Sequence, residues 1–114
     1  MKKIVPRKEV RWFAQFMEAR LRGNDHKGGW LDCPLEELLP RIYDEYREVL
    51  DAVAGQPGDV QAIVDECADV ANFAMMVADV VHRYGVYQAY KQVIATTDAT
   101  APDTIDTRFC KSHT

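Results

Sequence analysis

The first apolar repeat along the chain lies in the segment that ends at residue 22. Apolar side chains recur there every three or four residues, which is the spacing of one face of an α-helix. They are Val10, Phe13, Ala14, Met17 and Leu21. The pattern therefore predicts a helix from about residue 6 or 7 to residue 22, followed by a loop of turn-forming residues from 23 to 33.

A second apolar face follows the loop. Its members are Ile42, Tyr46, Val49, Leu50 and Val53. We expect this helix to begin near Pro34 and to have its main body at residues 41–54. Pro40 cannot donate an interior helical hydrogen bond, so it must either kink the helix or mark a new start.

The third predicted helix is the most apolar of the three. Asp59 is expected to cap its N-terminus, and Gly85 is expected to end it after about Tyr84. Between residues 67 and 81 the segment is apolar on almost all sides, so it needs neighbours on several sides. One short chain does not supply them, and we expect a homodimer or homotetramer to complete the bundle.

The predicted fold class is therefore an all-α helical bundle completed by oligomerisation. We assign residues 1–95 to this domain, with a short helix at residues 86–95, and residues 96–114 to an extended C-terminal arm. Hydrophobic residues make up 47% of the 114 residues and charged residues 28%, which is ordinary for one small globular domain.

Composition and charge narrow the possible partners. We recognise no signal peptide and no apolar stretch long enough to span a bilayer, so we expect no membrane partner. The three cysteines lack CxxC spacing, and reduced thiols in a cytosol are the simplest interpretation. A net charge of −4 disfavours a stable nucleic-acid partner. If the protein binds an anionic ligand, a divalent metal is the usual mediator.

Two pairs of acidic residues carry the candidate chemistry. Glu45 and Glu48 lie on the second predicted helix, and Glu66 and Asp69 lie on the third. A spacing of three residues puts both members of a pair on one side of a helix. If the two helices pack antiparallel, four carboxylates face one another and repel unless cations lie between them. Mg²⁺ suits such hard oxygen ligands, and we expect Mn²⁺ to be able to substitute.

A solvated acidic face is the competing interpretation, and for a single pair of this kind it usually holds. Two observations favour a site. A solvent face usually mixes charges of both signs, whereas four acidic residues dominate this part of the second helix: Asp44, Glu45, Glu48 and Asp51. The pair on the third helix lies at the rim of an otherwise apolar segment with little polar surface.

The order of the two pairs, separated by 17 residues, resembles the signature of the MazG-like all-α NTP pyrophosphohydrolases. Residues 65–73, Asp-Glu-Cys-Ala-Asp-Val-Ala-Asn-Phe, are very similar to the third motif of that family. Residues 24–30, Asn-Asp-His-Lys-Gly-Gly-Trp, resemble a branch found in phages and prophages and described as dATP/dGTP pyrophosphohydrolases. The resemblance covers roughly residues 10–84. After the third predicted helix, the chain lacks the Asn-Asp-Lys-like stretch in which many members of that family carry a phosphate-binding lysine.

The resemblance implies an enzyme of a bacterial or phage-infected cytoplasm that binds a small nucleotide. It would hydrolyse a (deoxy)nucleoside triphosphate, dATP or dGTP above all, to the monophosphate and pyrophosphate. The metal ligands implied are Glu45, Glu48, Glu66 and Asp69, which would hold roughly two or three Mg²⁺ ions for attack by water on the α-phosphorus. The catalytic residues would be Glu45 and Glu48, with Asp44 as a base or outer ligand and Asn72 as further support.

The loop that resembles the phage branch supplies the expected substrate contacts. Lys27 would meet a phosphate, Trp30 would stack on the base, and Asn24 would reach the base edge. His26 belongs to the same candidate group, although a loop histidine is more often a hydrogen-bonding partner within the loop. An equally supported alternative is that Trp30 anchors the loop on the core.

The sequence leaves three other interpretations to compare with this one. A di-iron bundle requires Glu-x-x-His motifs, and no histidine of this chain lies three residues after a glutamate. A zinc site would draw on His26, Cys33, Cys110 and His113, which lack paired ligand spacing. The main alternative is a non-catalytic adaptor, a small helical oligomer whose acidic faces serve solubility.

Overall fold

The computed structural model describes residues 2–97, with side chains up to residue 89. This part of the chain contains helices and no strand. They are α1 (Lys8–Gly23), a 3₁₀ turn η1 (Asp25–Lys27), α2 (Leu35–Gly55) and α3 (Val60–Thr97). The predicted all-α class is confirmed for these residues.

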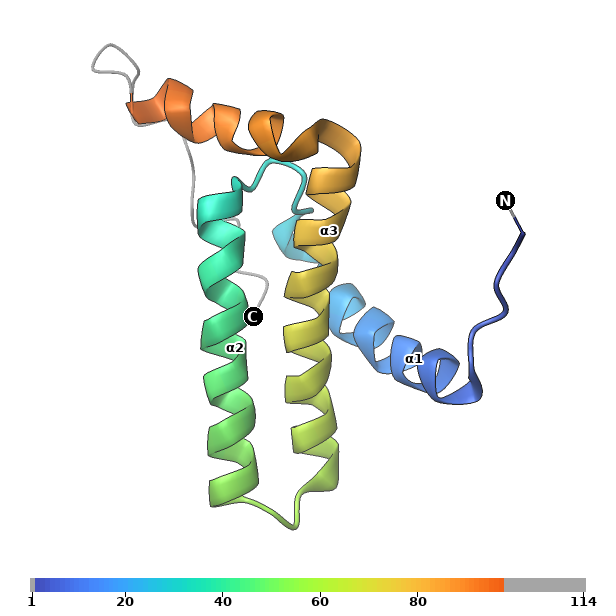
Figure 1. Ribbon diagram of the computed structural model, residues 1–114. Helices are drawn as coiled ribbons and strands as arrows, with labels where there is room; N and C mark the ends of the chain where they lie inside the picture. The colour runs from blue at the N-terminus through green and yellow to red at the C-terminus, as the bar shows by residue number, and fades with distance from the viewer. Residues whose placement is uncertain (1, 98–114) are drawn as a thin grey trace.

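α2 and α3 lie side by side and run antiparallel as a helical hairpin (Figure 1). A short turn joins them, and Asp59 caps α3 because its Oδ1 accepts a hydrogen bond from the Ala62 backbone N–H at 3.0 Å. α1 contacts α3 and projects away from the hairpin (Figure 1). α3 is therefore the central element, as its apolar character predicts.

Pro40 lies inside α2, which begins after Pro34 and continues across it. The alternative of a new helix start at Pro40 is therefore wrong. The proline has no backbone N–H, so it removes one donor from the helical hydrogen-bond pattern.

The predicted break at Gly85 is confirmed. Gly85 has φ 75° and ψ 162°, a left-handed backbone conformation that interrupts the helical run within α3. The chain changes direction there and a second helical segment continues to Thr97 (Figure 1). The predicted arm at residues 96–114 lies, apart from its first two residues, outside the described residues.

The core lies at the end of the hairpin near Gly85. It consists of Cys33, Leu35, Leu38, Phe73, Met76, Val80 and Ala89. The apolar segment that we expected to need a second protomer contains a girdle of five residues: Val70, Phe73, Ala74, Val77 and Val81. Phe73 of this girdle belongs to the core. Val77 and Val81 of that girdle pack against the core, whereas Ala74 is exposed. α2 and the loop before it therefore cover much of the girdle within one chain.

α1 is attached to α3 through partly buried apolar side chains and through specific polar contacts. None of its residues is fully buried, and Leu21 is its contribution to the surroundings of the core. Asn72 Nδ2 donates a hydrogen bond to the Met17 carbonyl at 3.0 Å, and Arg20 forms an ion pair with Asp69. These contacts hold α1 beside the acidic part of α3.

The expectation of reduced thiols is wrong for Cys33, which is disulfide-bonded. Cys67 is a free thiol, as expected. The cytoplasmic location inferred from reduced thiols stays a prediction.

Across the described helices, no segment has both the length and the apolar character that crossing a membrane requires.

The position of the core predicts which leucines stabilise the fold. Leu38 is 0% exposed, so Leu38→Ala should lower the free energy of unfolding by about 2–5 kcal/mol through lost burial and a residual cavity. Leu31→Ala, the same change at a loop leucine that is 39% exposed, should lower it by less than about 1 kcal/mol. Urea unfolding followed by circular dichroism measures both. Equal losses in the two variants would contradict this core.

Candidate metal centre

Three of the predicted ligands meet between α2 and α3. Glu45 and Glu48 come from the C-terminal half of α2, and Glu66 comes from the N-terminal part of α3. One carboxylate oxygen from each residue lies within 4.8 Å of the others. We call these three residues the carboxylate cluster. The short turn between the antiparallel helices brings them together, because it places the end of one helix beside the start of the next.

The carboxylate cluster runs from the surface into the protein. Glu48 is exposed, Glu66 is partly buried and Glu45 is 0% exposed. Glu45 Oε1 accepts a hydrogen bond from Arg41 Nη2 at 3.2 Å. Glu45 Oε2 and Glu66 Oε2 are buried without a hydrogen-bond donor among the described residues. Buried acceptors without a partner are costly, and a cation or a shared proton would satisfy them.

The same burial governs the protonation of the carboxylate cluster. Loss of solvation, together with the neighbouring carboxylates of Glu48 and Asp69, raises the pKa of Glu45 to about 8 against the opposing charge of Arg41. Loss of solvation, with Glu48 and Asp69 again adding to it, raises the pKa of Glu66 to about 7. A proton shared with Glu48 is one way to relieve the repulsion, and a divalent cation is another.

Asp69, the fourth predicted ligand, lies outside the carboxylate cluster in this structure. Its side chain is buried and accepts two hydrogen bonds from Arg20, one from Nε at 3.0 Å and one from Nη2 at 2.7 Å. This pairing raises the pKa of Arg20 further above its already high value. Asp69 is nevertheless near enough for its charge to raise the pKa of Glu45 and Glu66.

Arg41 is a residue of this centre that the sequence analysis missed. Its guanidinium donates to Asp44 Oδ2 at 3.3 Å and to Glu45, and it lies 5.2 Å from the centroid of the Phe73 ring. The signal was present in the sequence, because Arg41 precedes both acidic residues at helical spacings of three and four. Asp44 itself is exposed and points to Arg41 rather than into the carboxylate cluster.

Arg20 was also missed, and no local signal could have found it. Forty-nine residues separate it from Asp69, so the contact depends on how α1 packs on α3. Asn72 lies one turn after Asp69 and binds the Met17 carbonyl, while its buried Oδ1 has no hydrogen-bond partner among the described residues. It supports the position of α1 next to the acidic residues.

The predicted substrate loop lies at a distance from the carboxylate cluster. Trp30 packs against the core, and its Nε1–H donates to Asp79 Oδ2 at 2.9 Å. Asp79 lies roughly 20 Å beyond Glu66 along α3, at 1.5 Å per residue. The structure therefore shows Trp30 anchoring the loop, and its predicted stacking on a base stays a prediction.

The remaining loop candidates lie near α1 and in η1. Asn24 Nδ2 donates to the Arg20 carbonyl at 3.1 Å, which ties the loop to the end of α1. Lys27 is half-buried and His26 is exposed, both in η1. Their predicted contacts with a nucleotide stay predictions.

The chemistry of the donor set fits a hard divalent cation. Three carboxylates converge, and two of their oxygens are buried without donors among the described residues. Mg²⁺ and Mn²⁺ prefer such oxygen ligands, whereas the histidine or thiolate ligands typical of zinc are absent from this group.

Comparison of the chain with protein-family models, with curated proteins and with solved structures finds no match. The resemblance to the MazG-like family therefore stays a prediction from the sequence motifs. The carboxylate cluster is an independent observation, because it follows from side-chain positions rather than from resemblance.

The raised pKa of Glu45 predicts how the stability of the cation-free protein depends on pH. A glutamate that binds its proton more tightly in the folded state contributes stability that is full below its ordinary pKa of 4.5 and is lost as the pH rises through about 8. In a chelating buffer, the melting temperature should fall over this interval by at least about 5 °C. Calorimetric melts at constant ionic strength measure it.

Glu45→Gln is the matched variant for this measurement, since it keeps the shape of the side chain and removes the titrating group. Its melting temperature should depend more weakly on pH than that of the wild type. A wild-type melting temperature that rises between these pH values, or the same slope in both proteins, would contradict the assigned cause.

Proposed function

We propose that this chain is a Mg²⁺-dependent nucleoside triphosphate pyrophosphohydrolase of the MazG-like type. The observation that carries the proposal is the buried, unpartnered Glu45 oxygen beside Glu48 and Glu66. An adaptor whose acidic residues served only solubility would place them at the surface, where hydration is favourable. The order and spacing of the two acidic pairs support the same proposal.

The chemistry proposed is hydrolysis between the α- and β-phosphates to give a nucleoside monophosphate and pyrophosphate. Bound divalent cations would neutralise the charge of the triphosphate and acidify a water molecule. The residues proposed to hold them are Glu45, Glu48 and Glu66, joined by Asp69. Arg41 donates a hydrogen bond to the Glu45 carboxylate and would orient it, and the buried ring of Phe73 lies against the Arg41 guanidinium.

The proposed substrates are purine deoxynucleotides, dATP and dGTP. This preference comes from the resemblance of residues 24–30 to the phage branch. Asp44 is retained as a candidate base, because it is exposed beside Glu45 and its ion pair with Arg41 is long, at 3.3 Å. We place the protein in a bacterial or phage-infected cytoplasm on the same resemblance.

The test is a panel of the common NTPs and dNTPs with Mg²⁺, with products resolved by ion-exchange chromatography. We expect monophosphate and pyrophosphate, formed fastest from dATP and dGTP. Glu48→Gln and Glu66→Gln should each retain less than about a tenth of the wild-type rate, because each removes a charged ligand. Asp51→Asn, on the exposed side of α2, should keep the wild-type rate.

Two outcomes would contradict the proposal. One is nucleoside diphosphate and phosphate as products, which would place the cleavage at another bond. The other is a rate in Glu48→Gln or Glu66→Gln equal to that of Asp51→Asn. Faster turnover of dCTP or dUTP than of dATP and dGTP would remove the purine preference alone.

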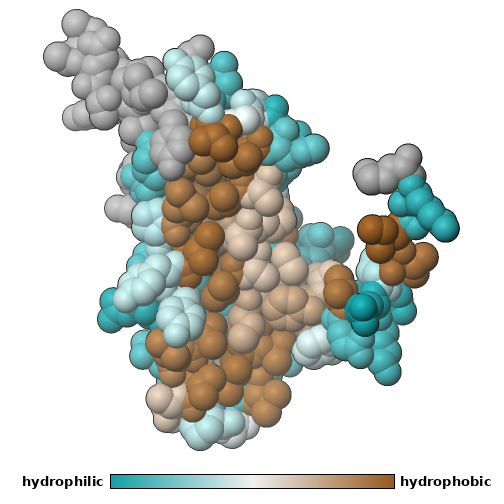
Figure 2. Space-filling model, viewed as in Figure 1, coloured by the Kyte–Doolittle hydropathy of each residue, from teal (hydrophilic) through white to brown (hydrophobic). Residues whose placement is uncertain are grey.

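We also propose that the protein is a homodimer or homotetramer, with α2 as the interface. Five apolar or aromatic residues, each between 42% and 61% exposed, follow a spacing of four and three residues along α2. They are Leu39, Tyr43, Tyr46, Leu50 and Val53. This spacing is that of a coiled-coil seam, and we call the set the α2 seam. Figure 2 shows apolar side chains gathered over α2 and α3, whereas polar ones prevail over α1.

The α2 seam predicts the effect of a charge at its centre. Leu50→Glu should convert the oligomer to a monomer at micromolar concentration, because a buried glutamate without a partner opposes association. Val10→Glu, at a residue of α1 that is 55% exposed, should leave the assembly unchanged. Light scattering coupled to size exclusion measures the mass. A wild-type protein that is a compact monomer would contradict the proposed assembly.

A further inference from the structure

The contact between Arg20 and Asp69 joins α1 to the rim of the carboxylate cluster. Both oxygens of Asp69 accept hydrogen bonds from the guanidinium. The two partners differ in their access to solvent: the Asp69 side chain is 4% exposed, whereas that of Arg20 is 37% exposed. A buried carboxylate is thus paired with a cation that still reaches the surface.

Two arginines neutralise the acidic centre, and they are held in different ways. Arg41 is fixed by two carboxylates and by the ring of Phe73. The described hydrogen bonds of the Arg20 side chain all go to Asp69. If a cation neutralised Asp69, Arg20 would lose its hydrogen-bonded counter-ion and keep only the more distant charges of Asp65 and Glu66. Arg41 would keep its hydrogen bonds to Asp44 and Glu45.

We propose that Arg20 is a phosphate-binding residue. It pairs with Asp69 until a divalent cation competes for that carboxylate, and it then becomes available to a phosphate group. The inference rests on the proposed function, since it assumes a cation at the carboxylate cluster. Both oxygens of Asp69 accept hydrogen bonds from Arg20, so a cation that binds this carboxylate competes with Arg20 for them. A phosphate group, like a carboxylate, presents two oxygens to a guanidinium. Arg20 would therefore leave Asp69 and bind the phosphate.

A purely structural role for Arg20 predicts different behaviour. The ion pair also anchors α1, together with the hydrogen bond from Asn72 to Met17. Loss of an anchor lowers stability and lowers the affinity for every ligand near α1. Loss of a competitor raises the affinity for the cation. The sign of the change in cation affinity therefore separates the two roles.

The experiment uses the full chain and two probes. Isothermal titration calorimetry measures binding of Mg²⁺ alone, and then, in saturating Mg²⁺, of a dATP analogue with methylene in place of the oxygen between its α- and β-phosphates. Arg20→Gln should bind Mg²⁺ about three- to tenfold more tightly than the wild type. It should bind the analogue at least about tenfold more weakly.

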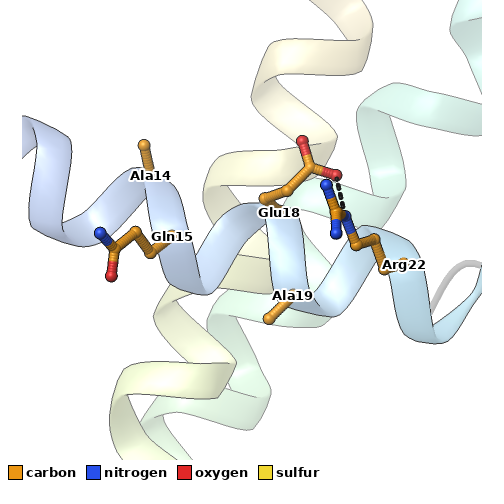
Figure 3. A pocket seen from close by; sticks show the side chains of 5 residues that line it. All are labelled: Ala14, Gln15, Glu18, Ala19 and Arg22. Carbon is orange, nitrogen blue, oxygen red and sulfur yellow. Dashed lines mark hydrogen bonds and ion pairs between the residues drawn. The ribbon is translucent and has the colours of Figure 1, made fainter.

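Arg22→Gln is the matched control. Arg22 lies on the same helix and pairs with Glu18 at 3.4 Å, and both side chains are well exposed (Figure 3). The two arginines are two residues apart, so they point to different sides of α1. Arg22→Gln should leave the affinities for Mg²⁺ and for the analogue unchanged.

A second variant guards against misfolding of Arg20→Gln, which circular dichroism would reveal. Arg20→Lys keeps the positive charge and loses the fork, so it should bind Mg²⁺ as the wild type does and the analogue more weakly. Unchanged or weaker Mg²⁺ binding by a folded Arg20→Gln, or unchanged analogue binding, would overturn this inference alone. Failure of the wild type to bind Mg²⁺ and to hydrolyse any nucleotide would overturn the proposed function as well.

Discussion

Repulsion among like charges in a poorly solvated space is the constraint on which the acidic half of this protein depends. The antiparallel hairpin brings the carboxylates of Glu45, Glu48 and Glu66 together, and burial of Glu45 and partial burial of Glu66 remove water that would otherwise screen them. Protons, arginines and metal cations are the available ways to offset this repulsion. The neighbouring contacts of Arg20 and Arg41 follow from that requirement.

Burial of apolar side chains in one half of the hairpin stabilises the fold and offsets the charge repulsion in the acidic half. The core gathers at the end near Gly85, away from the carboxylate cluster. Arg41 lies between the two regions, with its guanidinium over Phe73 of the core and its donors on Glu45. Arg41 thus contacts both the apolar core and the carboxylate cluster. The antiparallel packing of α2 and α3 determines both contacts.

The sequence was most informative where the determinants are local. Asp59 and Gly85 mark real helix boundaries because a capping side chain and a left-handed backbone act within a few residues. The convergence of three predicted ligands followed from helical spacing and a short turn. The partners of Asp69 and Trp30 could not be predicted, since each contact spans forty-nine residues and depends on packing between elements. Proline usually interrupts a helix, but α2 continues across Pro40 because the flanking residues favour a continuous helix.

The bend at Gly85 has a consequence for which substitutions the chain tolerates. A Cβ atom at this position would meet no neighbouring atom within 4 Å, so packing imposes no limit. The limit is torsional, because φ of 75° strains any residue with a side chain by about 1–2 kcal/mol. Ala89, just beyond the bend, lies in the core beside residues that precede and begin α2. The backbone conformation of Gly85, and not the packing around it, therefore sets the direction in which the chain continues to Ala89.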